Sequence, residues 1–145
     1  MDLVDIKKEG IYIDANIFIY TIEWFEEYNE ILENFYNYIY KNNIYTCTSE
    51  LTISECLVKP LKDKNIKSVN NYLSSIKNNN LLWVFPIWKD ILLESAKIRA
   101  EVWWKLPDAI HWATANKYNC KYFFTNDKKI KLPKNLVPIF LSELS

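Results

Sequence analysis

Short apolar runs alternate along the chain with longer segments in which apolar residues recur at helical spacing. The short runs are rich in β-branched and aromatic residues and end at polar residues, as strands do. The first of them, Ile11-Tyr-Ile13, stops at Asp14. This pattern predicts strands at residues 11–13, 44–48, 81–85 and 121–125, with residues 137–141 as a candidate fifth strand.

The segments between the strands favour helices, and several carry boundary signals. Ser49 suits an N-cap, Pro60 a helix stop, and Pro107 a first helical turn. Asn119 stands where a helix often ends in a left-handed residue. We predict helices at residues 26–40, 49–59, 63–77, 89–104 and 107–118.

The order of these elements predicts the fold class. Strands that alternate with helices form a mostly parallel sheet with helices on both faces. At 145 residues, the chain has the length of one ordinary domain and is too short for two with separate cores. We therefore expect a single α/β domain over residues 1–145, with three layers and a central sheet of four to five strands.

Composition excludes several classes of protein. Half of the residues are apolar and a quarter are charged, which argues against a disordered chain. No apolar run has the length of a membrane span, and the N-terminal residues lack the apolar core of a secretory signal. The three cysteines, an odd number without paired spacing, favour reduced thiols in a cytoplasmic protein over a disulfide framework.

The formal net charge is zero, which is mild evidence against a protein that binds nucleic acid by electrostatics alone. Catalytic acids would nevertheless offset basic residues in that sum. Basic residues gather in two clusters, which we interpret as solvated surface. The clusters are Lys59, Lys62, Lys64 and Lys67, and then Lys128, Lys129, Lys131 and Lys134.

Four carboxylates are the candidate catalytic and metal-binding residues. Asp14 ends the first predicted strand, and Asp127 lies two residues beyond the fourth. Asp108 opens the helix that leads into the fourth strand, and Glu55 lies in the helix after the second. Ligand sites of parallel sheets form beyond the carboxyl ends of the strands. This rule places Asp14 and Asp127 at one edge of the sheet, where the other two acids could join them.

Each acid also has a plainer role open to it, in a strand end, a capping box, a helix start or a turn. Glu55 fits its plainer role least, because the pattern puts it on an apolar helix face with Leu51 and Val58. Converging carboxylates repel one another unless a cation lies among them, and all-oxygen ligands suit Mg²⁺ or Mn²⁺ rather than zinc. His111, the only histidine, is interpreted as structural, and a single glycine, Gly10, excludes a glycine-rich phosphate loop.

Four segments resemble, in order, the motifs of PIN-domain nucleases, and most of all those of the VapC-type toxins of toxin–antitoxin pairs. The resemblance extends over essentially the whole chain. It implies that the four acids bind Mg²⁺ or Mn²⁺ and that three further polar residues support them, namely Asn16, Thr125 and Asn126. The segments are Ile11–Asn16, Thr48–Glu55, Pro107–Ala115 and Phe124–Asp127.

The same resemblance implies an activity and partners. The reaction would be metal-dependent hydrolysis of RNA phosphodiester bonds, in substrates that are typically single-stranded or looped. Proteins of this kind are typically homodimers that bind an antitoxin. The alternative is a PIN-like domain that no longer cuts RNA and acts as an RNA- or protein-binding module.

Aromatic residues make up 16% of the chain. We expect most of the six tryptophans to lie in the core. The side chains of a second group of tryptophans and tyrosines cannot all point inward from their helices. We therefore expect an exposed aromatic patch. Such a patch suits a dimer or partner-protein surface, with base stacking as the rival interpretation. This group is Trp103, Trp104, Tyr28, Tyr36, Tyr38 and Tyr40.

Overall fold

The computed structural model describes all 145 residues and contains five strands and six helices, with a short 3-10 turn near each end. None of the helices is long and apolar enough to span a membrane. The elements are η1 (Leu3–Asp5), β1 (Gly10–Ile13), α1 (Ala15–Ile22), α2 (Glu26–Lys41), β2 (Thr46–Ser49), α3 (Leu51–Lys62), α4 (Ile66–Ser75), β3 (Trp83–Phe85), α5 (Lys89–Val102), α6 (Leu106–Lys117), β4 (Cys120–Thr125), β5 (Val137–Phe140) and η2 (Leu141–Glu143).

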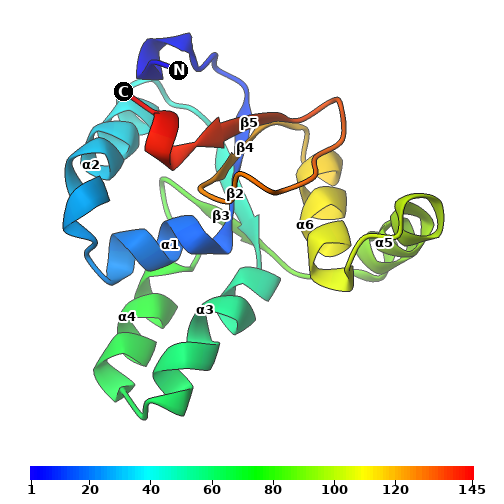
Figure 1. Ribbon diagram of the computed structural model, residues 1–145, viewed down its shortest axis with the longest axis horizontal. Coiled ribbons are helices and arrows are strands. Elements are labelled where there is room, and N and C mark those ends of the chain that lie inside the picture. The colour runs from blue at the N-terminus through cyan, green and yellow to red at the C-terminus, as the bar shows by residue number, and fades with distance from the viewer.

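The five strands form one sheet in the order β3-β2-β1-β4-β5, and every neighbouring pair is parallel (Figure 1). The predicted α/β fold class is therefore confirmed, and the candidate fifth strand is present. β1 lies at the centre, with β2 on one side and β4 on the other. Because parallel strands end at a common edge, the ends of β1 and β4 are adjacent, and Ile13 pairs with Phe124.

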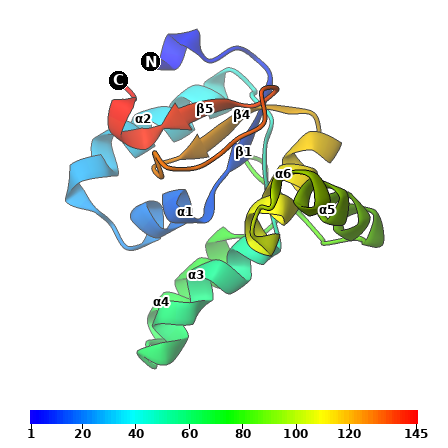
Figure 2. The same ribbon diagram turned by 45° about the vertical axis from the view of Figure 1, so that its right-hand side comes forward.

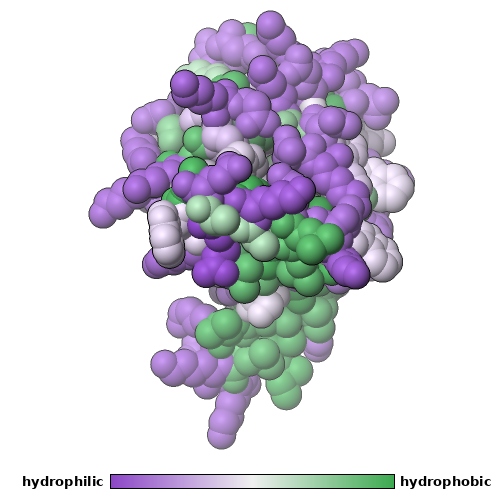
Figure 3. Space-filling model, turned by 90° about the vertical axis from the view of Figure 1, so that its right-hand side faces the viewer, coloured by the Kyte–Doolittle hydropathy of each residue, from purple (hydrophilic) through white to green (hydrophobic).

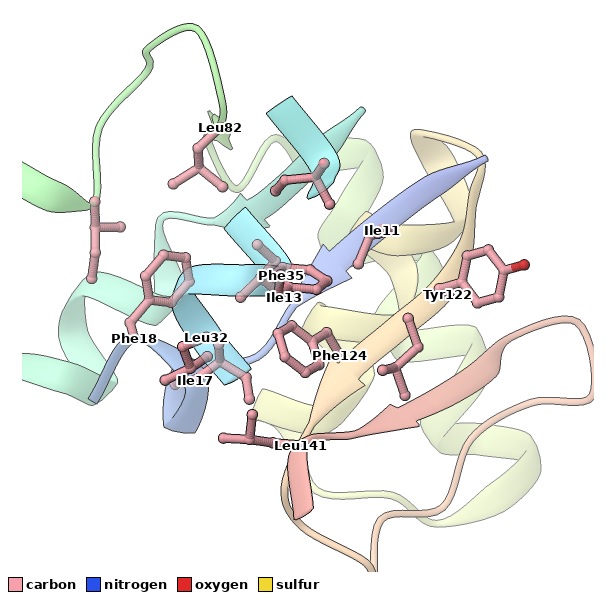
Figure 4. Packing of buried hydrophobic residues seen from close by; sticks show 14 of the residues in the cluster. Ile11, Ile13, Ile17, Phe18, Leu32, Phe35, Leu82, Tyr122, Phe124 and Leu141 are labelled. Carbon is pink, nitrogen blue, oxygen red and sulfur yellow. The ribbon is translucent and has the colours of Figure 1, made fainter. Parts of the chain in front are cut away.

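The two faces of the sheet are covered by different helices. Ile11 and Ile13 of β1 and Phe124 of β4 face the larger core, which α1 and α2 complete (Figure 4). Tyr12 and Phe123, one position out of phase, face a smaller cluster against α6. This alternation is the period of two expected for a strand, and it explains why a central strand is apolar on both faces.

Two helix pairs extend beyond these layers. α5 packs on the outside of α6, while α3 and α4 form a hairpin that projects from one end of the sheet (Figure 2). Ile91 and Ile98 of α5 are buried against Ala109 and Ala113 of α6. These residues form a third apolar cluster, between the two helices.

Several predicted boundaries are wrong by a few residues. α3 continues past Pro60 to Lys62, because Pro60 is buried in tertiary contacts that outweigh its poor fit within a helix. The N-cap position of α3 is Glu50 rather than Ser49, although the Ser49 hydroxyl still accepts the Leu51 N–H at 3.1 Å. Asn119 has the predicted left-handed conformation, with φ of 57°.

The helix predicted from residue 63 begins only at Ile66. Asn65 is its N-cap, and the Asn65 side chain accepts the Ser68 N–H at 3.0 Å. The second strand begins at Thr46 rather than at Ile44, which is buried in the preceding loop. None of these shifts moves the residues of the candidate site out of their predicted elements.

Candidate metal centre

Asp14 is the anchor of the candidate site, at the junction of β1 and α1. Its Oδ1 accepts the Ala15 N–H at 2.8 Å, as an N-cap does. Its Oδ2 accepts the Thr125 hydroxyl at 2.7 Å and the Asn16 amide at 3.2 Å. Burial raises the pKa of the Asp14 carboxyl, while the hydrogen bond from Thr125 acts in the opposite direction. The carboxylate is therefore held rigidly in a place that disfavours its charge.

The three predicted supporting residues form a network around Asp14. The Thr125 hydroxyl also accepts the Asn16 amide at 3.1 Å and the Asp127 N–H at 3.1 Å. The side-chain Oδ1 of Asn16 accepts the Asn126 N–H at 3.1 Å. The ends of β1 and β4 are thus tied together through side chains, and the turn that carries Asp127 is tied to both.

Glu55 is held by His111. The Nε2 of His111 hydrogen-bonds to Oε1 of Glu55, and its Nδ1 hydrogen-bonds to the hydroxyl of Tyr12. The Tyr12 hydroxyl also accepts the Ser49 N–H at 3.1 Å. Tyr12 is fully buried, and His111 is 4% exposed, so water does not compete for the two hydrogen bonds of the Tyr12 hydroxyl.

With a neutral His111 imidazole, this chain of hydrogen bonds has one consistent direction. The Ser49 N–H can only donate, and Glu55 as a carboxylate can only accept. The Tyr12 hydroxyl therefore accepts from Ser49 and donates to His111 Nδ1, and a neutral imidazole carries its proton on Nε2. His111 is buried, but sequence reasoning missed that it bonds to one of the candidate acids.

The two remaining acids lie at the rim of the same cleft. Asp108 is in the first turn of α6, as predicted, and its side chain makes no hydrogen bond or ion pair. Asp127 lies in the turn after β4, where its Oδ1 accepts the Lys129 N–H at 2.9 Å. Both are exposed. All four candidate acids line one cleft of about 290 Å³, beyond the carboxyl ends of β1 and β4.

The four acids share this cleft, but no three of them lie close enough together to hold an ion in their observed positions. Oε1 of Glu55 is hydrogen-bonded to His111, which leaves Oε2 of the same carboxylate free. The donor set consists only of carboxylate oxygens, which suits a hard divalent cation. The environment of Asp14 also favours a divalent cation, because a nearby positive charge would offset the cost of burying the negative charge of its carboxylate.

The surroundings of Glu55 differ from those predicted. The buried face of α3 is formed by Thr52, Cys56 and Pro60, whereas Val58 is 64% exposed. Glu55 therefore does not lie on a buried apolar face. It lies at the boundary between the helix and the cleft, with 35% of its side chain exposed.

The tryptophans are also distributed differently from the prediction. Four of the six are exposed, and only Trp104 and Trp112 are partly buried. These two line the apolar side of the cleft, with ring centroids 4.8 Å apart. The predicted aromatic patch does not form as one surface, because Tyr28, Tyr36 and Tyr38 pack against the larger core. The exposed tryptophans are Trp24, Trp83, Trp88 and Trp103.

Comparisons with known proteins agree with this architecture. The family model of the PIN domain matches residues 11–135. A sequence comparison with curated proteins finds no match. Among solved structures, a toxin–antitoxin complex from Klebsiella pneumoniae is 24% identical, with a TM-score of 0.61, over 88% of this chain and 95% of that one. A second, VapBC2 from Rickettsia felis bound to a promoter DNA fragment, is 18% identical, with a TM-score of 0.72, over 90% and 98% of the two chains.

Proposed function

Because the chain belongs to the PIN domain family, we propose that it is a metal-dependent endoribonuclease that hydrolyses RNA phosphodiester bonds. The observation that carries the proposal is the cleft itself. Asp14, Glu55, Asp108 and Asp127 come from four separate parts of the chain and line one cavity at the carboxyl edge of a parallel sheet. Asp108 and Asp127 are exposed, so the packing of the core does not require acids at those two positions.

Each acid would have a defined part in binding Mg²⁺ or Mn²⁺. Asp14, fixed by hydrogen bonds from Ala15, Asn16 and Thr125, would be the rigid ligand. Glu55 would bind through Oε2 while His111 holds Oε1. Asp108 and Asp127, whose side chains are exposed at the rim, would complete the site by turning inward.

When bound, the metal supplies an activated water and charge neutralisation at the phosphoryl group. The protein contributes the arrangement. The network of Asn16 and Thr125 keeps the Asp14 carboxylate oriented, and the apolar wall of Trp104, Trp112 and Phe123 limits the access of bulk water. In-line attack on a phosphodiester requires placement and charge rather than a protein nucleophile, so carboxylates suffice.

We also propose that the protein is the toxin of a toxin–antitoxin pair, with a cognate antitoxin as its protein partner. Both similar structures named above are complexes of a toxin with its antitoxin. A partner surface is available, because apolar residues gather on the face viewed in Figure 3, from the main body down to the projecting end of the molecule. The exposed apolar residues of the molecule include Val58 and Leu61 of α3 and Leu92 and Leu93 of α5.

A homodimer and a cytoplasmic location belong to the same proposal. The exposed apolar residues of α3 and α5 would serve self-association as well as antitoxin binding. The three cysteines are free and buried, which is consistent with a reducing compartment, where RNA is also found. Sedimentation of the purified chain tests the dimer directly, and a single-chain mass at micromolar concentration would contradict it.

A catalytically silent module that binds RNA or protein is the second candidate function. It is favoured by one observation, that no three of the acids lie together as a ready metal site. The two functions differ in what the acids do. In a silent module, the loss of Asp108 would leave binding intact and there would be no cleavage to lose.

The test is cleavage of an end-labelled, structured RNA by the purified protein with Mg²⁺, with Mn²⁺ or with EDTA. Asp14→Asn and Asp108→Asn should each abolish metal-dependent cleavage. Glu101→Gln is the matched control, because it removes an exposed acid on α5, outside the cleft. Cleavage that survives both aspartate substitutions, or that persists in EDTA, would contradict the proposal.

A further inference from the structure

One wall of the acid cleft is aromatic, and metal binding gives no reason for it. Trp104 and Trp112 line the cleft together with all four acids. Trp112 lies one helical turn after Asp108 on α6, and Trp104 lies just before that helix begins. Carboxylates that bind a cation need only oxygen donors. Two indoles beside them place a large, flat apolar surface next to the reacting group.

The backbone turns so that one tryptophan of an adjacent pair enters the cleft. Trp103 ends α5 in a left-handed conformation, with φ of 54°, and is 91% exposed. Trp104, the next residue, is partly buried and lines the cleft. The Arg99 side chain donates its Nε–H to the Trp104 carbonyl oxygen at 3.1 Å, which ties this turn to the last turn of α5.

Trp104 is supported from behind but not enclosed. Its ring lies against Trp112 at a centroid distance of 4.8 Å and an angle of 46°. Both rings also contact the apolar cluster between α5 and α6. Trp104 thus packs against the cluster, and because the residue is only partly buried and lines the cleft, it remains accessible to a ligand. Lys131, which is exposed and lines the same cleft, adds a positive charge.

We infer that Trp104, backed by Trp112, is the surface on which an unpaired base of the RNA substrate stacks beside the four acids. This inference rests on the proposed function, since it names a substrate feature of the same cleft. Aromatic side chains stack on any unpaired base, whereas the bases of a duplex are already stacked on one another. Lys131 contacts the phosphate chain of the same strand.

The test measures binding without cleavage, so that it does not depend on activity. The protein carries Asp108→Asn, and a short fluorescein-labelled single-stranded RNA of mixed sequence is titrated in EDTA. Trp104→Leu, which keeps apolar bulk but removes the flat ring, should weaken binding by about 5-fold to about 100-fold. Trp104→Phe should restore most of the affinity. Trp103→Asn, next along the chain but outside the cleft, is the matched control and should bind as the parent does.

Two further readouts separate stacking from a loss of packing or charge. An abasic version of the same RNA strand should bind to Trp104→Leu with the same affinity as to the parent protein. A duplex RNA should likewise show equal affinity for the two proteins. The salt dependence of binding should be unchanged in Trp104→Leu, whereas Lys131→Ala should reduce the slope by about 0.7, because one phosphate is then no longer neutralised. Thermal unfolding confirms that each variant is folded.

The outcomes are distinct from those of the cleavage test. Equal affinity of the parent and Trp104→Leu for single-stranded RNA would overturn the stacking inference, even if the protein cleaves RNA. An equal loss of affinity for base-free and base-containing chains would overturn it too. Base-dependent loss in Trp104→Leu would support it, even if cleavage were never observed.

Discussion

The buried hydroxyl of Tyr12 allows a sharp prediction, because it connects β2 to the candidate site. Tyr12→Phe removes one oxygen and nothing else. The Ser49 N–H then loses its acceptor, and His111 Nδ1 loses its donor, at a place where both Tyr12 and His111 are buried. Water cannot replace the hydroxyl without a rearrangement of the core.

The expected cost follows from these two orphaned groups. Each buried polar group that loses its partner costs roughly 1–3 kcal/mol. Part of this loss is offset, because phenylalanine has no hydroxyl group that must be desolvated on folding. We expect Tyr12→Phe to lower the free energy of unfolding by about 2–4 kcal/mol. Equilibrium unfolding in urea with EDTA, followed by tryptophan fluorescence, measures it, and an unchanged m-value shows that the unfolded state is comparable.

Tyr36→Phe is the matched control. The Tyr36 hydroxyl lies 2.9 Å from the Thr21 hydroxyl. The Thr21 hydroxyl donates to the Ile17 carbonyl oxygen at 2.8 Å and keeps that bond in Tyr36→Phe. No buried donor is orphaned, so the expected loss is only about 0.5–1.5 kcal/mol. Equal losses in the two variants, within about 0.5 kcal/mol, would refute the hydrogen-bond reasoning, given the usual error of such extrapolations.

The same substitution should also be felt at the metal. Without the Tyr12 hydroxyl, either nitrogen of His111 can carry the proton, and a bare Nε2 repels the Glu55 carboxylate. Loss of such an orienting partner typically weakens metal affinity by about 10-fold to about 100-fold. Mn²⁺ titration calorimetry on Tyr12→Phe and Tyr36→Phe measures the difference, and identical affinities would show that the chain does not position Glu55.

Three other predictions concern the metal, pH and packing. Mn²⁺ at about 100 times its dissociation constant should stabilise the protein by about 2.7 kcal/mol in thermal unfolding, and Asp108→Asn should lose most of that gain. In EDTA, the raised pKa of Asp14 means that its protonated form favours folding. The contribution of this protonation to the free energy of unfolding is complete below the ordinary pKa of 3.8 and is lost as pH rises through the raised pKa. In urea titrations, the stability of the parent relative to Asp14→Asn should therefore fall as pH rises. Gly10→Ala should cost about 1–3 kcal/mol in the same assay, because the added methyl group would lie 2.9 Å from Tyr45 Cδ1 and 3.2 Å from Cys120 Cα; no loss would contradict that steric reasoning.

The parts of the site that the sequence predicts are those set by topology. Asp14 and Thr125 lie at the ends of β1 and β4, and parallel neighbours necessarily end at one edge. Their hydrogen bond at 2.7 Å also requires β1 and β4 to be neighbours, which the alternation of elements alone does not specify. Asp108 is likewise placed by its helix start, which Pro107 marks in the sequence.

The parts that it does not predict depend on side-chain contacts between distant elements. His111 and Glu55 are 56 residues apart, and no local pattern relates them. The signal available was that a lone histidine on a helix facing a sheet needs two partners for its ring nitrogens. Tyr12, at the centre of an otherwise aliphatic strand, is the polar partner that such a search would have found.

Helical periodicity assigned Glu55 to the wrong surroundings for a related reason. The Leu51–Val58 face is apolar, but it belongs to a hairpin that projects from the sheet, and there Val58 is exposed. Likewise, four exposed tryptophans contradict the prediction that most of the six lie in the core. Both errors come from assuming that apolar residues report a core, when the chain leaves apolar surface uncovered.

The most direct test of the account is anomalous diffraction from crystals of the protein soaked in Mn²⁺. We expect one or two strong peaks within the cleft, at coordination distance from carboxylate oxygens of Asp14 and of at least two among Glu55, Asp108 and Asp127. The Glu55 contact should be made through Oε2, with His111 still bonded to Oε1. Peaks only elsewhere on the surface, or none in the cleft at saturating Mn²⁺, would contradict the claim that these four acids form a metal centre.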